Sequence, residues 1–122
     1  MKPIGVAPVV VEKKWGGELI VCNNAEFCGK FLTIRRGCKF SMHFHRDKRE
    51  VFYLLSGKLA LRFIETETAR TFEIQMFRGD TMEIPRLLPH QLEALEDSEV
   101  VEFSTHHEDS DSYRVAPGDS QK

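Results

Sequence analysis

Four residues of types that bind metal ions occur at suggestive spacing along the chain. His43 and His45 lie two positions apart in the stretch SMHFHRDKRE, and Glu50 ends that stretch. Side chains two positions apart in a β-strand point to the same face, so the two imidazoles are expected to point together. A turn through residues 46–49 would bring Glu50 back beside them, and His90 begins a later strand-like segment. Three imidazoles and one carboxylate form a typical ligand set for a divalent transition metal.

The spacing alone leaves a plainer interpretation open, because a His-x-His pair in a β protein is often incidental. Burying three imidazoles and a carboxylate without a cation would be costly, whereas surface residues would need no particular spacing. The ligand types fit zinc, manganese, iron, cobalt or nickel alike, so the metal stays unnamed. A metal with five or six ligands would keep a position open for catalysis.

The segments that carry these residues alternate between apolar and polar positions. In KLALRF, Leu59, Leu61 and Phe63 share one face, while Lys58 and Arg62 share the other. Several further segments are short and rich in β-branched or aromatic residues, and turn residues separate them: KFLTI, EVFYLL, TMEI, HQLEAL and EVVEFS. About ten short strands with turns between them predict an all-β sandwich or barrel.

Length and composition predict one domain over residues 1–122. The segment 12–104 is expected to form the core, and the polar segment 105–122 is interpreted as a tail that docks through Tyr113 and Val115. The net charge is −2, with 17 basic and 19 acidic residues, which gives no electrostatic case for nucleic-acid binding. The three cysteines form no CxxC pair, which favours a reducing cytoplasm. No apolar run approaches the roughly 20 residues of a membrane span, so no membrane partner is expected.

The histidine segment resembles the first motif of the cupin superfamily at every position. That motif reads here as Gly37, five residues, His43, one, His45, four, Glu50, six, and Gly57. The second motif is matched by spacing at three positions, Gly79, Pro85 and His90. Leu87 and Ala94 stand where the family has a glycine and an asparagine. The resemblance implies a double-stranded β-helix (jelly-roll) barrel whose interior binds one metal through His43, His45, Glu50 and His90.

A closer resemblance links the chain to the cupin type of phosphomannose isomerase, from about residue 12 to residue 115. The segment VEKKWGGELIV is similar to that family's Trp-Gly-x-acidic start, and VEFSTHHEDSDSYRV is similar to its closing strand and acidic stretch. His43 replaces a glutamine of the family, Lys48 replaces an arginine, and Arg114 stands where an arginine is expected.

This resemblance implies a metal-dependent isomerase that interconverts mannose 6-phosphate and fructose 6-phosphate through an enediol(ate). Lys48 is the candidate for substrate contact or proton transfer, although it could equally be one more charge in an exposed turn. Arg114 is the candidate for holding the phosphate or covering the cavity mouth, with Lys30 and Arg86 as weaker phosphate ligands. Trp15 is expected either to form a wall of the pocket or simply to pack.

Two other functions use the same residues. Three histidines and a glutamate also suit an iron(II) dioxygenase, and a non-catalytic module could bind a metal or a sugar. His106 and His107 lie outside the motifs and are expected at the surface or in the tail, or else at the barrel mouth. The apolar segment VAPVVV suggests a homodimer formed through the N-terminal strand, or else an ordinary edge strand.

Overall fold

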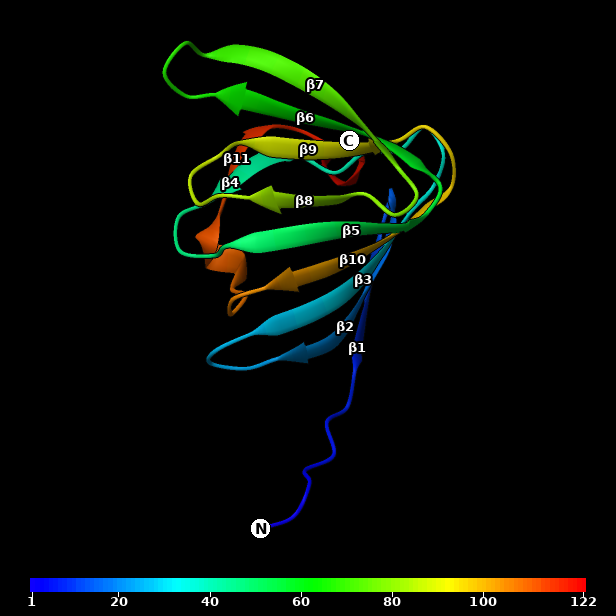
Figure 1. Cartoon of the computed structure of the whole chain (residues 1–122), viewed down its shortest axis with the longest axis vertical. Coiled ribbons are helices and arrows are strands. Elements are labelled where there is room, and N and C mark those ends of the chain that lie inside the picture. Colours follow the sequence, from blue (N-terminus) through cyan, green and yellow to red (C-terminus); the bar gives the residue numbers. More distant parts are fainter.

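The chain folds into two antiparallel β-sheets that face each other (Figure 1). The computed structural model describes all residues, Met1–Lys122. The first sheet holds, in spatial order, β1 (Val9–Lys13), β2 (Gly16–Asn23), β3 (Cys28–Ile34), β10 (Ser98–Ser104), β5 (Glu50–Ser56) and β8 (Thr81–Ile84). The second holds β11 (Ser112–Ala116), β4 (Met42–His45), β9 (His90–Ala94), β6 (Lys58–Glu65) and β7 (Arg70–Phe77). The predicted all-β jelly-roll class is confirmed.

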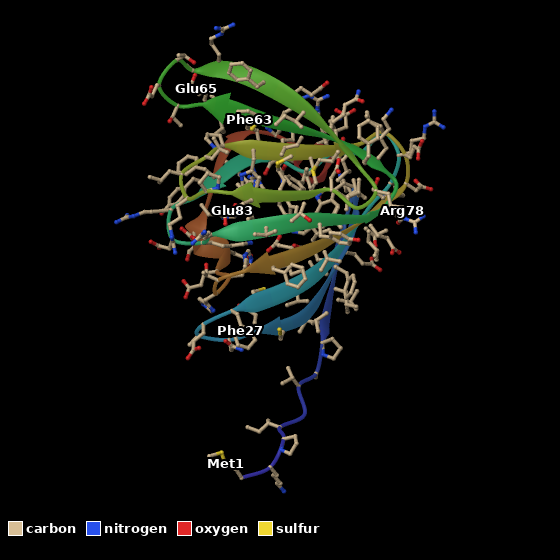
Figure 2. All side chains as sticks on the ribbon, viewed as in Figure 1. Met1, Phe27, Phe63, Glu65, Arg78 and Glu83 are labelled. Carbon is tan, nitrogen blue, oxygen red and sulfur yellow. The ribbon has the colours of Figure 1, made fainter.

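The inner faces of the sheets follow the period-two pattern expected for half-buried strands. Along β10, the buried residues are Ser98, Val100 and Glu102, and they alternate with more exposed ones. The apolar core includes Phe52, Leu54, Leu59, Leu61 and Leu92, and side chains from both sheets fill the space between them (Figure 2). The inner positions are therefore apolar in one part of the barrel, while another part buries charged side chains.

The segment 105–122, interpreted from its composition as a tail, is built into the fold. Its strand β11 pairs with β4, and Tyr113 stacks on Phe44 with ring centroids 5.1 Å apart. The Asp119 N–H donates to the Lys39 carbonyl, and the Lys39 N–H donates to Asp119 Oδ2. Val115 stays exposed. The composition of this segment does not indicate a strand, because β11 is held mainly by backbone pairing with β4 and has few apolar side chains.

The N-terminal residues lead away from the two sheets before β1 begins (Figure 1). Strand β1 lies at the edge of the first sheet and pairs with β2 of the same chain. Val9 and Val10 are exposed there, and the predicted pairing of two chains through this edge stays a prediction. The structure contains no helix long and apolar enough to cross a membrane.

Gly57 forms the tight turn between β5 and β6, and its replacement is the first test of the fold. Its φ is +94°, and an added Cβ would lie 2.3 Å from Ser98 Oγ and 2.4 Å from the Asp97 carbonyl oxygen. We expect Gly57→Ala to reduce the free energy of unfolding by about 3 kcal/mol, because backbone strain and a clash add together. Urea denaturation measures this loss. Gly5→Ala is the control, since nothing lies within 4 Å of its Cβ position; equal stability of the two variants would contradict the assignment.

Candidate metal centre

The second sheet brings three histidine side chains together inside the barrel. His43 and His45 lie on β4, and His90, the first residue of β9, pairs with His43 across the strands. One ring nitrogen of each histidine lies within 4.8 Å of those of the other two. The ring centroid of His43 lies 4.9 Å from the ring centroid of His45 and 4.9 Å from that of His90. The expected convergence of these residues is therefore present in the fold.

Backbone carbonyls determine which nitrogen of each ring carries the proton. The Nδ1 atoms of His43, His45 and His90 lie 2.8, 3.1 and 2.9 Å from the carbonyl oxygens of Ser41, Asp111 and Leu88, respectively. A carbonyl oxygen can only accept, so each Nδ1 must be the donor. Each Nε2 is then left with a free lone pair in the neutral ring. This arrangement, in which the outer nitrogen is anchored and the inner one is free, is the one that metal-binding histidines adopt.

Burial keeps two of these rings uncharged. Burial, reinforced by the neighbouring histidines, lowers the pKa of His43 to about 3. Burial likewise lowers the pKa of His45 to about 4, although Glu50 works in the opposite direction. Both imidazoles are therefore neutral at physiological pH, which is the protonation state a metal ligand needs.

Glu50 reaches the histidines from the opposite sheet, at the start of β5. Its Oε1 lies 2.7 Å from His90 Nε2 and 3.6 Å from His45 Nε2. Burial by itself raises the pKa of Glu50, but the ammonium group of Lys48 works against it, and that pKa lies below its ordinary value. The carboxylate oxygen and His90 Nε2 are both buried without a hydrogen-bond partner. Two lone pairs that face each other in a buried site are stabilised by a cation between them, so the donor set fits a divalent metal.

Lys48 is buried beneath this cluster and is not one more charge in an exposed turn. Its Nζ lies 3.2 Å from Glu50 Oε2, 2.8 Å from Glu102 Oε2 and 3.2 Å from His107 Nδ1. Burial by itself lowers the pKa of Lys48, but Glu102 and Glu50 outweigh it and hold that pKa above its ordinary value. The side chain is therefore a permanent ammonium group.

Glu102 is a buried carboxyl that lies outside the motifs of the sequence. Burial, together with the charge on Glu50, raises the pKa of Glu102 above its ordinary value. Its inward position follows from the alternation along β10, where Val100 and Glu102 lie on the same face. In the segment EVVEFS, Glu102 lies two positions after Val100, and this period-two spacing is the one sequence feature that indicates its inward position.

Asp111 ties the C-terminal segment to the histidine-bearing loop. Its carboxylate accepts hydrogen bonds from the backbone N–H groups of Arg46, Asp47 and Lys48, and its carbonyl accepts from His45. Burial by itself raises the pKa of the Asp111 carboxyl, but the hydrogen bonds from the three backbone N–H groups outweigh it and lower that pKa. The turn that carries Lys48 to the cluster is therefore held from the far end of the chain.

Of the cluster, His43, His45 and Glu50 line a polar cavity of about 270 Å³, while His90 lies buried behind them. Lys30, Lys48 and Arg114, among the predicted substrate contacts, line this cavity, and so does His107. Arg86 does not line the cavity. Its Nε instead donates a hydrogen bond to the Asp47 carbonyl at 2.7 Å.

Two aromatic candidates are also placed by the structure. Trp15 packs in the apolar core and also lines the cavity, so it has both of the expected roles, packing and forming a wall of the pocket. His106 lies outside the cavity, where its Nδ1 contacts the Asn24 carbonyl oxygen at 2.7 Å.

Leu87 explains how the loop before His90 departs from the expected motif. It stands where the motif has a glycine, yet its φ is +72°, in the left-handed region that favours glycine. Its N–H donates to the His45 carbonyl at 2.8 Å. The loop thus holds a non-glycine residue in the left-handed region, and its hydrogen bond ties the start of β9 to the end of β4.

Comparison with known families identifies residues 30–106, more than half of the chain, as a match to the cupin domain. No curated protein sequence matches the chain.

Three solved structures share the fold. CapF, a capsular polysaccharide assembling protein from Staphylococcus aureus, has 18% sequence identity and a TM-score of 0.76, covering 92% of this chain and 33% of that one. Oxalate decarboxylase from Bacillus subtilis has 18% identity and a TM-score of 0.76, covering 88% and 30%. KdgF from Halomonas sp. has 20% identity and a TM-score of 0.66, covering 77% and 81%. The chain spans about a third of the first two proteins, and the likeness concerns the fold.

Proposed function

We propose that this chain, which belongs to the cupin domain family, is a metal-dependent sugar-phosphate isomerase that interconverts mannose 6-phosphate and fructose 6-phosphate. The observation that carries the proposal is the convergence of three lone-pair-bearing imidazoles and the Glu50 carboxylate, with His43, His45 and Glu50 exposed to a polar cavity. We assign His43, His45, Glu50 and His90 as ligands of one divalent transition metal. The sugar-phosphate substrate follows from the resemblance of the chain to the cupin type of phosphomannose isomerase.

Aldose–ketose isomerisation moves a proton between two neighbouring carbons through an enediol(ate). A divalent metal supplies electrostatic stabilisation of the negative charge that develops on the substrate oxygens. Lys48 contacts Glu50 and lines the same cavity, so we assign it to the reacting end of the substrate. Because its pKa is held high, it acts there as a hydrogen-bond donor and not as the base.

Isomerisation is tested by incubating metal-loaded protein with mannose 6-phosphate in D2O without oxygen and following the sugar by NMR. We expect fructose 6-phosphate to form and the carbon-bound proton to exchange with deuterium, because the enediol(ate) loses that proton. The experiment is repeated with zinc, manganese, iron(II), cobalt and nickel. No product with any of these metals would contradict the proposal.

Two further measurements on the metal-loaded protein, oxygen uptake and stabilisation by ligands, distinguish the other two functions that suit this donor set. Oxygen uptake that requires iron(II) would indicate a dioxygenase. Stabilisation by a sugar or a metal without turnover would indicate a binding module.

A further inference from the structure

The charged side chains that line the cavity fall into two groups. Most are paired within the protein: Lys30 with Glu18 at 3.1 Å, Lys48 with Glu50 and Glu102, and His107 with Asp109 at 2.9 Å. Lys13 and Arg114 line the same cavity, and neither forms an ion pair or a side-chain hydrogen bond. The cavity therefore carries two cations that form no direct ion pair within the protein.

Both free cations belong to the edge strands that flank the cavity. Arg114 on β11 lies directly opposite His43 on β4, and residues paired across antiparallel strands point to the same face. On β1, Val11 pairs with the cavity-lining Glu18, and Lys13 lies two positions further along, on that same face. Lys13 thus approaches from the first sheet and Arg114 from the second.

We propose that Lys13 and Arg114 together bind the phosphate group of the substrate, an inference that rests on the proposed function. A guanidinium offers paired N–H donors that match phosphate oxygens, and an ammonium adds a point charge from the other side. Ser120 adds a hydroxyl to the cavity lining; its Oγ accepts from the Lys14 N–H, which leaves its own O–H free to donate.

This placement also orients the sugar. The histidines lie on β4 and β9, whereas Lys13 and Arg114 lie on the edge strands β1 and β11. The phosphate is held at the edge strands, and the opposite end of the sugar, which carries the carbonyl chemistry, points toward the histidines and Lys48. The two cations then select for a phosphorylated sugar over a neutral one.

The test measures equilibrium binding to the metal-loaded protein by calorimetry, with mannose 6-phosphate, mannose and inorganic phosphate as separate probes. We expect Lys13→Met and Arg114→Met each to weaken mannose 6-phosphate binding about 10- to 100-fold, as for the loss of one charge-assisted contact. Mannose binding should be unchanged. Arg78→Met is the matched control, because Arg78 is exposed and lies outside the cavity lining (Figure 2).

The inference is overturned if wild-type protein binds mannose 6-phosphate no more tightly than mannose, or if Arg78→Met weakens binding as much as Lys13→Met does. Binding of inorganic phosphate that is lost in both variants supports a phosphate subsite even if the sugar is never turned over. In that case the isomerase proposal fails and the subsite stands. If the protein turns over mannose 6-phosphate but neither substitution changes the KM, the isomerase proposal stands and the phosphate subsite fails.

Discussion

Replacing His45 with alanine is expected to abolish stable binding of a divalent metal and, with it, all turnover. The substitution removes one of three converging Nε2 lone pairs in a buried site. Loss of partners outside the ligand set already weakens metal binding by about 10- to 100-fold, so loss of a ligand is expected to weaken it by more than about 100-fold. Metal stoichiometry after dialysis, measured by elemental analysis, checks this directly.

The chain offers a matched control for the His45 variant. His106 is also a histidine, but it lies outside the cavity and contacts Asn24 and Glu108. His106→Ala should keep one metal per chain and full activity. Metal retained by the His45 variant, or lost equally by both variants, would contradict the assigned ligand set.

Replacing Lys48 with methionine is expected to reduce the free energy of unfolding by about 3–5 kcal/mol, the usual loss when one partner of a buried ion pair is removed. The variant leaves two buried carboxyl groups, Glu50 and Glu102, without their shared counter-charge. Chemical denaturation of the metal-free protein at neutral pH measures the loss. Adding Glu102→Gln should recover part of it, because only one buried carboxylate then remains.

The pH dependence and a surface pair provide the checks on this result. The pKa of Glu102 in the folded protein lies above its ordinary value of 4.5, so its ionisation destabilises the fold as pH rises through that range. The deficit of the Lys48 variant should therefore shrink in mild acid. Arg49→Met removes an exposed ion pair with Glu83 and should cost less than about 1 kcal/mol. Equal losses of unfolding free energy for Lys48→Met and Arg49→Met would contradict the buried ion pairs assigned to Lys48.

Local patterns in the sequence predict the strands and the convergence of His43, His45, Glu50 and His90. The period-two rule places His43 and His45 on one face, and the spacing of the cupin motifs connects Glu50 and His90 to them. The structure brings the four side chains together, while metal binding by them stays a prediction. These features were accessible because they depend on neighbours in the chain or on a motif with regular spacing.

The residues that the sequence did not reveal depend on contacts between distant segments. Glu102 reaches Lys48 only because β10 lies between β3 and β5, and a single sequence does not specify that order. Asp111 sits in a polar stretch that resembles a solvated tail, yet it binds the turn at residues 46–48. Lys48 itself could be interpreted as exposed or functional until the structure showed its burial.

The division of the cluster between the two sheets has a consequence for the order of folding. The histidines belong to the second sheet, whereas Glu50 and Glu102 belong to the first, and Asp111 joins them from the C-terminal segment. No hairpin or single sheet holds the whole donor set, so a partly assembled chain cannot present it. A metal ion would therefore bind only after the long-range pairings have formed, and its binding energy would be added to the stability of the complete barrel.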